Sequence, residues 1–187
     1  MSTAARGRPR ASSRETIADA ATELFLEQGY EATAVTEITR RAGVSRSSFF
    51  NYFAGKADIL WFVLDQRIAA VLEAVADATV PVPEALALLA AGPGPETLAL
   101  AIVDARTMSV EEELAAGRAE RQLRLGAALA ERLVRDGSDP WTAEIAGAGY
   151  AAAVLGAVWR WAERGAGRTP LEAPLSEALA AARALLS

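Results

Sequence analysis

The chain has 187 residues, of which 52% are hydrophobic, and a formal net charge of −5. This length and composition allow one sizeable domain or two small ones with a well-buried core. Cysteine and histidine are both absent, which excludes disulfides, thiolate metal sites and the most usual general base and metal ligand. We therefore expect a binding protein rather than an enzyme, with no catalytic residues, no metal and no cofactor.

The N-terminal region lacks the apolar stretch of a secretory signal, and no uncharged run reaches the about 20 residues of a membrane-spanning helix. These features predict a cytoplasmic protein without a membrane partner. Residues 1–56 carry eight Lys or Arg and six Asp or Glu side chains, whereas residues 57–187 carry eleven and eighteen. Because nucleic-acid affinity depends on the local potential, the acidic total does not exclude it.

Residues 1–11 contain Arg6, Arg8 and Arg10 but no acidic residue. Such a segment cannot form a core, so we predict a disordered basic arm. Its Arg-Gly-Arg-Pro sequence resembles an AT-hook, which inserts into the narrow minor groove of A·T-rich DNA. The alternative is a basic tail that adds only nonspecific affinity. Either function would increase the salt dependence of DNA binding.

Three helices are expected after this arm. Ser12, with Glu15 as a capping box, begins the first helix and Gly29 ends it. The next helix is short and amphipathic and ends at Gly43. Ser45 is the expected N-cap of a third helix. The expected core of the three helices consists of Ile17, Ala20, Ala21, Leu24, Phe25, Ile38, Val44, Phe49 and Phe53.

The second and third helices have the pattern of a helix-turn-helix. Arg46, Ser47 and Ser48 lie at the start of the third helix, where side chains can approach base edges and the helix dipole favours phosphate. An ordinary solvated helical hairpin is the alternative interpretation of this spacing. Arg40 and Arg41, on the polar side of the preceding helix, fit a solvated face as well as a phosphate contact.

Residues 33–60 resemble the N-terminal domain of the TetR family of one-component transcriptional regulators, and the match extends back to about residue 12. The matching positions are Thr33, Val35, Ile38, Ala42 to Ser45, Phe49 to Phe53 and Lys56. The chain departs from the family pattern at Ala34, Thr39 and Phe50, where the family usually has a capping Thr or Ser, an Ala and a Tyr. Thr33 or Thr36 is therefore expected to supply the cap and its DNA contact.

The resemblance implies a division of roles at the DNA interface. Base contacts are implied for Thr36, Arg46, Ser47 and Phe50, and backbone contacts for Ser48, Asn51, Tyr52 and Lys56. The chemistry agrees, because Arg can pair bidentately with guanine whereas Lys is a point charge suited to phosphate.

The remainder of the chain is predicted to be helical. A helix after Lys56 carries a continuous apolar stripe, which in the resembled family belongs to the lever between the two domains. Pro83 to Ala91 can form only a short helix, and helices are expected at about Glu96–Ser109 and Val110–Arg135, with or without a turn between them. Asp139 should cap a further helix that has Pro140 at its first position. The apolar stripe of the helix after Lys56 contains Ile59, Leu60, Val63, Leu64, Ile68, Val71, Leu72 and Val75.

Residues 145–159 contain no charge. A helix that is apolar all round must be buried on every side. Gly147, Gly149 and Gly156 would let another backbone approach, so we expect a homodimer through helices at about 140–164 and 171–187, as the resemblance also implies. A central helix enclosed by its own chain is the alternative.

The resemblance further implies a pocket for an unknown small effector, lined by hydrophobic side chains, with Arg106 facing an acidic group. The candidate residues are Trp61, Phe62, Arg106, Met108, Tyr150, Trp159 and Trp161, each of which could equally be core or interface.

We thus predict an all-α protein of about nine helices with an arm (1–11), a DNA-binding domain (12–70) and an effector-binding and dimerisation domain (71–187). The expected function is repression from a palindromic operator, and the alternative is a DNA-binding protein without an effector.

Overall fold

A computed structural model describes residues 13–165 and 168–186. The arm and the expected cap at Ser12 lie outside this range. Within it, the chain forms ten α-helices and one 3-10 turn, which agrees with the all-α prediction. They are α1 (Ser13–Gln28), α2 (Val35–Ala42), α3 (Arg46–Phe50), α4 (Lys56–Ala76), α5 (Val82–Ala87), η1 (Leu88–Ala90), α6 (Glu96–Val103), α7 (Ala105–Met108), α8 (Glu111–Arg135), α9 (Pro140–Glu163) and α10 (Glu172–Leu186).

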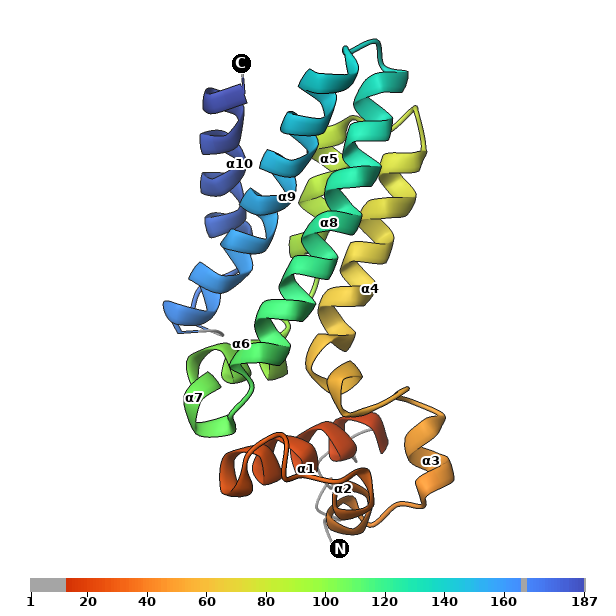
Figure 1. Ribbon diagram of the computed structural model, residues 1–187, viewed down its shortest axis with the longest axis vertical. Helices are drawn as coiled ribbons and strands as arrows, with labels where there is room; N and C mark the ends of the chain where they lie inside the picture. The colour runs from red at the N-terminus through yellow and green to blue at the C-terminus, as the bar shows by residue number, and fades with distance from the viewer. Residues whose placement is uncertain (1–12, 166–167, 187) are drawn as a thin grey trace, which may run out of the picture.

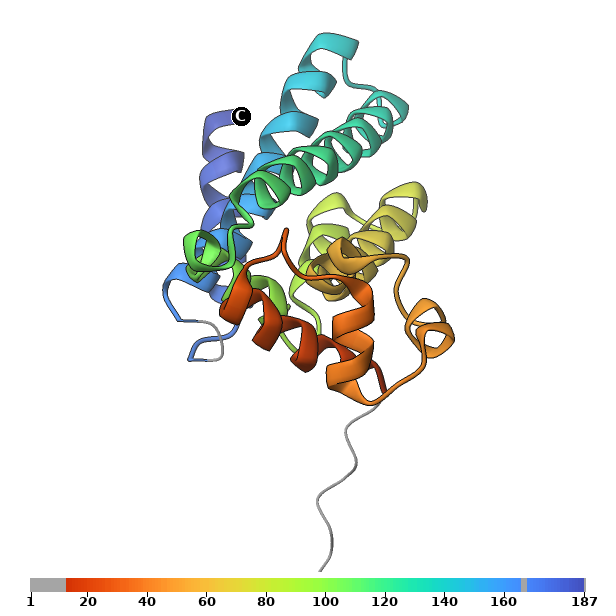
Figure 2. The ribbon, with the colours of Figure 1, turned by 60° about the horizontal axis from the view of Figure 1, so that its bottom comes forward.

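The helices fall into two groups. The short helices α1 to α3 cluster at one end of the molecule, and α4, α8, α9 and α10 extend away from that end (Figure 1). Figure 2 turns this end of the molecule toward the viewer and shows α3 at its edge. The helix α4 joins the two groups, because it begins directly after the α3 segment and packs along α8.

The core of the α1–α3 end is aromatic. Phe25 and Phe49 are fully buried, and Phe53 is nearly so. The Phe49 and Phe53 ring centroids lie 5.8 Å apart, and Phe25 packs edge-on against Tyr30 with centroids 5.0 Å apart. Phe49 and Phe53 are therefore structural, as the sequence predicted.

The segment expected to be one helix from Glu96 to Ser109 is broken in two. Asp104 (φ −101°, ψ 22°) separates α6 from α7, and Ser109 adopts the left-handed conformation with φ 52°. The N–H of Val110 donates to the Ala105 carbonyl at 3.0 Å, which closes the turn before α8. A turn at Ser109 therefore does separate the two expected helices, Glu96–Ser109 and Val110–Arg135, whereas the break at Asp104 within the first of them was not predicted.

The helix α9 begins as predicted. Asp139 caps it, its Oδ1 accepting from the N–H groups of Trp141 and Thr142, each at 3.1 Å, and Pro140 is its first residue. A hydrogen bond from the Thr142 side chain, together with these two from the backbone, lowers the pKa of the Asp139 carboxyl. The cap therefore fixes the chain direction after the α8–α9 loop.

The helix α9 packs between α8 and α10 (Figure 1). A Cβ at Gly147 would lie 2.5 Å from the Gly126 carbonyl oxygen, so this glycine permits close contact with α8 of the same chain rather than with a partner. By length and apolar composition, α9 is the one helix of the described residues that could cross a membrane, a property it shares with core helices of soluble proteins. Ten of its 24 residues are buried within the chain.

Candidate nucleic-acid interface

The helix α3 has only five residues, so its conformation depends on its ends. Ser45 is its N-cap, as predicted, and its Oγ accepts from the Ser48 N–H at 3.0 Å. The two serine hydroxyl oxygens are 2.9 Å apart and share a second hydrogen bond. Below the helix, Phe49 is fully buried. The cap and this aromatic anchor together fix which side of α3 faces outward.

The turn between α2 and α3 is equally well defined. Gly43 is left-handed, with φ 68°, and its N–H donates to the Arg40 carbonyl. The N–H of Val44 donates to the Thr39 carbonyl at 3.0 Å. Glycine adopts this conformation without the steric cost that a Cβ would add. The turn therefore sets the angle between the two helices of the predicted helix-turn-helix.

The outward side of α3 and the residues after it present polar and aromatic groups. Arg46, Ser47 and Asn51 are exposed, Ser48 is half-buried, and the large rings of Phe50 and Tyr52 are also exposed. The Arg46 guanidinium lies 5.5 Å from the centroid of the Phe50 ring. This surface combines a cation, hydrogen-bonding groups and apolar rings, the set that reads base edges and thymine methyl groups.

The start of α2 differs from the sequence prediction. Its N-cap is Ala34, and neither Thr33 nor Thr36 caps it. Instead Glu37 accepts from the Ala34 N–H at 3.0 Å, and this hydrogen bond lowers the pKa of the Glu37 carboxyl. Thr33 is only 2% exposed, and its hydroxyl donates to the Gly29 carbonyl at 2.7 Å. We leave Thr33 out of the candidate interface, while Thr36 is exposed and remains in it.

Lys56, expected at the DNA backbone, is engaged within the protein. Its Nζ donates to the Tyr30 carbonyl at 2.7 Å and lies 4.1 Å from the centroid of the Tyr30 ring. Burial is the main cause that raises the pKa of the Tyr30 phenol. Lys56 thus ties the start of α4 to the turn after α1, and any DNA contact must compete with this link.

Arg41 resolves one of the alternatives left by the sequence. It forms two hydrogen bonds to the Glu27 carboxylate, at 3.0 and 2.7 Å, and one to Glu23 at 3.1 Å. The hydrogen bonds from Arg41 to Glu27 lower the pKa of the Glu27 carboxyl. Arg40 has a largely exposed side chain, with Glu37 as a loose partner at 3.9 Å. Arg41 therefore holds α2 to α1, and Arg40 alone is available to a phosphate.

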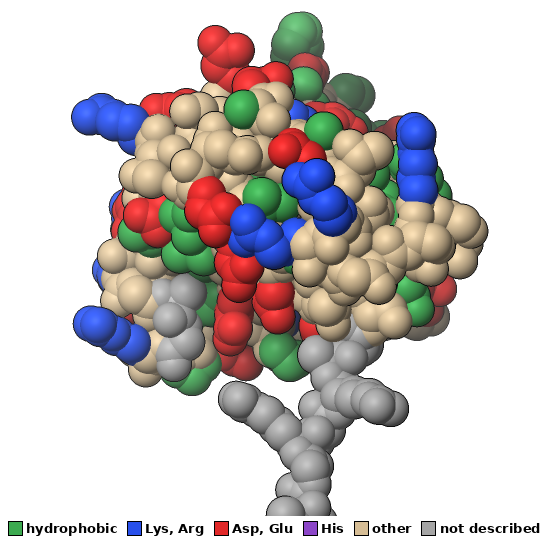
Figure 3. All heavy atoms as spheres, turned by 90° about the horizontal axis from the view of Figure 1, so that it is seen from below, with side chains coloured by type: hydrophobic (Ala, Val, Ile, Leu, Met, Phe, Trp, Pro, Cys, Tyr) green, Lys and Arg blue, Asp and Glu red, His purple; other side chains and the backbone are tan. Residues whose placement is uncertain are grey.

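The surface at this end carries mixed charge. Figure 3 views the molecule from the α1–α3 end and shows Asp and Glu side chains beside Lys and Arg side chains. The pairing of Arg41 with Glu23 and Glu27 accounts for part of this pattern. Positive charge is therefore not spread evenly over the face, and Arg46 at α3 is one of its unpaired cations among the described residues.

The predicted effector residues do not converge on one cavity. Trp61 is buried, with its indole N–H donating to Glu113 at 3.2 Å, and Arg121 lies 4.0 Å over its ring. Trp161 is also buried, and its N–H donates to the Thr169 carbonyl at 2.8 Å. Met108 is buried, and its carbonyl accepts from the Tyr30 N–H at 2.6 Å. These three residues have structural roles.

The other candidates are dispersed. Phe62 packs against Phe53, with ring centroids 5.8 Å apart, and so joins the core of the α1–α3 end. Arg106 is exposed on α7. Trp159 lines a shallow depression with Arg118, and Tyr150 lines a cavity between α5 and α10.

That cavity is the feature that sequence reasoning missed. Of its lining residues only Tyr150 was a candidate, because the others belong to helices that meet only in the folded chain. One signal was available, namely the single cation Arg183 within an otherwise apolar and alanine-rich stretch of α10.

Comparison with known proteins connects this geometry to a family. Residues 17–60 match the family model described as bacterial regulatory proteins, tetR family. The chain is 32% identical over 125 residues to the HTH-type transcriptional repressor Rv1474c of Mycobacterium tuberculosis, covering 67% of this chain and 66% of that protein. It is 47% identical over 51 residues to the HTH-type transcriptional regulator HbdR of an Aromatoleum species, covering 27% and 22%.

The fold likeness extends over most of the chain. The structure of NalD, the secondary repressor of the MexAB-OprM multidrug efflux pump in Pseudomonas aeruginosa, superposes with a TM-score of 0.53 at 21% identity, covering 92% of this chain and 94% of that one. The family model covers residues 17–60, and the chain spans between about a fifth and two thirds of the length of the two relatives. With its capped α3 and its left-handed turn at Gly43, the chain belongs to the tetR family of bacterial regulatory proteins.

Proposed function

We propose that the chain is a DNA-binding transcriptional regulator that reads its operator with α3. The carrying observation is the combination of a Ser45 cap, a buried Phe49 and an outward face that includes Arg46, Ser47 and Asn51. Arg46 pairs with guanine, and Ser47, Thr36 and Phe50 contact neighbouring bases. Ser48, Asn51, Tyr52 and Arg40 contact the phosphates. Lys56 contributes to the phosphates only if it leaves the Tyr30 carbonyl.

A dimer supports this function, since two α3 helices related by a two-fold axis read a palindrome. The outward stripe of α9 provides a surface for it. Trp141 and Ile145 are 76% and 62% exposed, and Ala148 and Ala152 continue the same face. On α10, Leu185 is 86% exposed. Large apolar side chains gathered on two long helices are typical of a contact between subunits.

Repression and its release by a small hydrophobic molecule complete the proposal. Bound to an operator that overlaps a promoter, the dimer blocks transcription. An effector bound among the apolar helices α5 to α10 would favour a spacing of the two α3 helices that no longer fits the operator. The competing function is that of a DNA-binding protein without an effector, for which no small molecule would release the DNA.

The experiment measures dimerisation and operator binding together. Ile145→Glu adds a charge to the α9 stripe, and Ala69→Glu adds the same charge to an exposed position of α4. We expect the Ile145 variant to sediment as a monomer and to lose at least about 100-fold in affinity for the chain's upstream DNA, because the second half-site no longer contributes. The Ala69 variant should match the wild type in both measurements.

Two results would reject the proposal. A wild type that binds random DNA as tightly as its upstream region would indicate a nonspecific DNA-binding protein. An Ile145→Glu variant that stays dimeric would remove the α9 stripe from the interface. Symmetric protection of two half-sites in a footprint would support the palindrome.

A further inference from the structure

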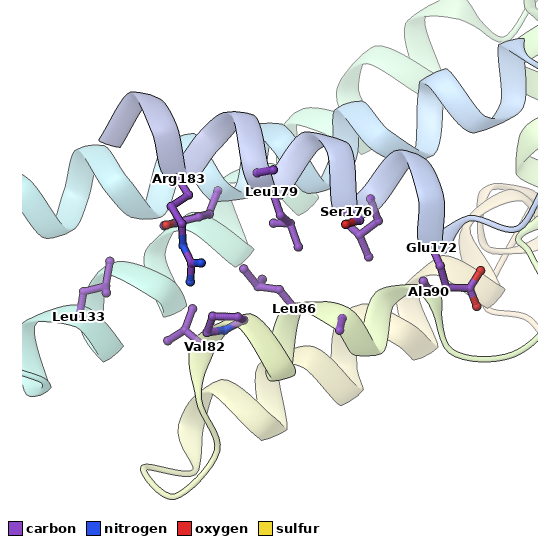
Figure 4. A pocket seen from close by; sticks show the side chains of 13 residues that line it. Val82, Leu86, Ala90, Leu133, Glu172, Ser176, Leu179 and Arg183 are labelled. Carbon is purple, nitrogen blue, oxygen red and sulfur yellow. The ribbon is translucent and has the colours of Figure 1, made fainter. Parts of the chain in front are cut away.

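The helices α5 and α10 face each other across a cavity of about 530 Å³, the α5–α10 cavity. Figure 4 shows Val82, Leu86 and Ala90 on one wall and Ser176 and Leu179 on the other. Leu133 of α8 and Tyr150 of α9 complete the lining. The volume lies within the range of pockets that bind small molecules, and the walls are predominantly apolar. The cavity therefore suits a ligand with an elongated hydrophobic body.

The two charged residues that line this cavity differ in whether another charge compensates them. Glu172 and Arg183 both line it and lie eleven residues apart on α10, or about 16 Å along the helix axis. Glu172 interacts favourably with the charge of the buried Arg67. Arg183 has neither a hydrogen bond nor an ion pair with any described residue. The one uncompensated charge of the lining is thus the guanidinium of Arg183.

A second polar group lies at the Arg183 end. A Cβ at Gly149 of α9 would lie 3.0 Å from Leu186, so α9 meets the last turn of α10 there. Tyr150 follows Gly149, lines the same cavity and is half-buried, and its hydroxyl has no hydrogen bond to any described residue. A guanidinium and a phenol hydroxyl, both without partners among the described residues, thus line the same cavity, and each can donate a hydrogen bond to an anionic oxygen.

We propose that the α5–α10 cavity binds an amphipathic monocarboxylate, with the carboxylate at Arg183 and Tyr150 and the apolar body along Leu86, Leu175 and Leu179. Arg183, rather than Arg106, is then the residue that receives the acidic group. This assignment deepens the effector-release part of the proposed function and rests on it for its regulatory consequence. The binding itself does not depend on DNA.

The α5 wall is connected to α4, which gives ligand binding a route to the α3 end. Arg67 of α4 donates to the Leu89 carbonyl at 2.8 Å and also to the Pro93 carbonyl. Burial lowers the pKa of Arg67, and its two carbonyl partners hold η1 and the following loop against α4. A ligand that separates α5 from α10 displaces η1 and so tilts α4, whose first residue follows the α3 segment.

The test uses the full-length protein without DNA. Octanoate, decanoate and dodecanoate are titrated calorimetrically, with decanol as the uncharged match of decanoate. We expect Arg183→Leu to weaken binding of the best carboxylate by about tenfold or more, because a charge-assisted hydrogen bond is lost, and to leave decanol binding unchanged. Arg106→Leu is the matched control and should bind like the wild type.

A second variant tests the location of the apolar body. Leu179→Trp fills the cavity from the α10 side and should abolish binding of both decanoate and decanol, while far-ultraviolet circular dichroism verifies that the variant is folded. Should it be unfolded, Ser176→Phe fills the same cavity from an exposed position. The assignment is overturned if no carboxylate binds the wild type, if Arg183→Leu binds all of them normally, or if Arg106→Leu is the variant that fails.

A separate measurement keeps this inference distinct from the proposed function. Release of upstream DNA by the bound carboxylate is followed by fluorescence anisotropy. Carboxylate binding without DNA release would overturn the regulatory route through Arg67 and leave the binding site standing. A protein that binds the carboxylate but no specific DNA would overturn the proposed function alone.

Discussion

The α1–α3 end and the α8–α10 bundle achieve a fixed geometry in different ways. The helices α2 and α3 have eight and five residues, too few to be stable alone, and depend on the Ser45 cap, the Gly43 turn and the Arg41 link to α1. The helices α8 and α9 have 25 and 24 residues, and their backbones approach closely at small residues such as Gly147. The first region is specified by local signals and a few polar links, the second by packing between distant segments.

The largest expected effect concerns the aromatic anchor of the α1–α3 end. Phe49→Ala should lower the free energy of unfolding by about 3–5 kcal/mol, because a fully buried ring is replaced by a cavity. Phe50→Ala removes the exposed neighbouring ring and should change stability by less than about 1 kcal/mol. Urea unfolding followed by circular dichroism measures both. Equal losses would contradict the different roles of the two rings.

Arg46→Ala tests the outward face of the same region. We expect it to lose about 1–3 kcal/mol of discrimination at one base pair of each half-site, because the guanine pairing disappears. Anisotropy titrations against operators with single base changes measure the discrimination. Lys56→Met is the comparison, since it breaks the link to Tyr30 and should lower stability without changing base preference. If Arg46→Ala keeps the base preference of the wild type, Arg46 is not among the residues that contact bases.

Two glycines of α9 test how closely the α8–α10 bundle is packed. A Cβ at Gly147 would meet the Gly126 carbonyl oxygen at 2.5 Å and the Ala130 nitrogen at 2.8 Å, whereas at Gly156 the nearest atom is 4.0 Å away. Gly147→Ala should therefore destabilise the fold by about 1–3 kcal/mol, despite the better helix propensity of alanine. Gly156→Ala should stabilise it by about 0.5–1 kcal/mol. Thermal unfolding of the two variants gives opposite signs if the packing is as described.

The smallest expected effect concerns the Arg41 link and its pH dependence. Arg41 holds the pKa of Glu27 below its ordinary value of 4.5. A carboxyl whose pKa falls on folding stabilises the folded state above its unfolded pKa, and this contribution is lost as the pH falls through the folded value. Arg41→Met should therefore lower Tm at neutral pH, and the difference from the wild type should shrink below about pH 4. A Tm difference that stays constant down to pH 2 would show that it does not come from the Arg41–Glu27 pair.

Local signals explain why much of the fold could be predicted. Ser45, Gly43 and the Asp139–Pro140 pair act on backbone groups within a turn of themselves, so their roles follow from the sequence. The periodic stripe of α4 is equally local, and Ile59, Leu64 and Ile68 are buried as expected. The break between α6 and α7 at Asp104 was missed because no glycine or proline in the residues around it marks a helix end.

The functional residues were less predictable, because their roles depend on partners distant in the sequence. Lys56 has the chemistry of a phosphate contact, yet the Tyr30 carbonyl, 26 residues away, occupies it. Thr33 is buried under the turn after α1. Arg183 lines a cavity only because α10 packs opposite α5. In each case the side chain indicates what it can bind, and the fold determines what it meets.

The most direct test of sequence-specific binding by α3 is a competition at physiological salt. The wild-type protein is bound to its labelled upstream intergenic DNA and challenged with the same DNA unlabelled or with a scrambled sequence. We predict that the scrambled DNA competes at least about 1,000-fold less well, as expected for a specific DNA-binding protein. Equal competition by the two DNAs would contradict the account.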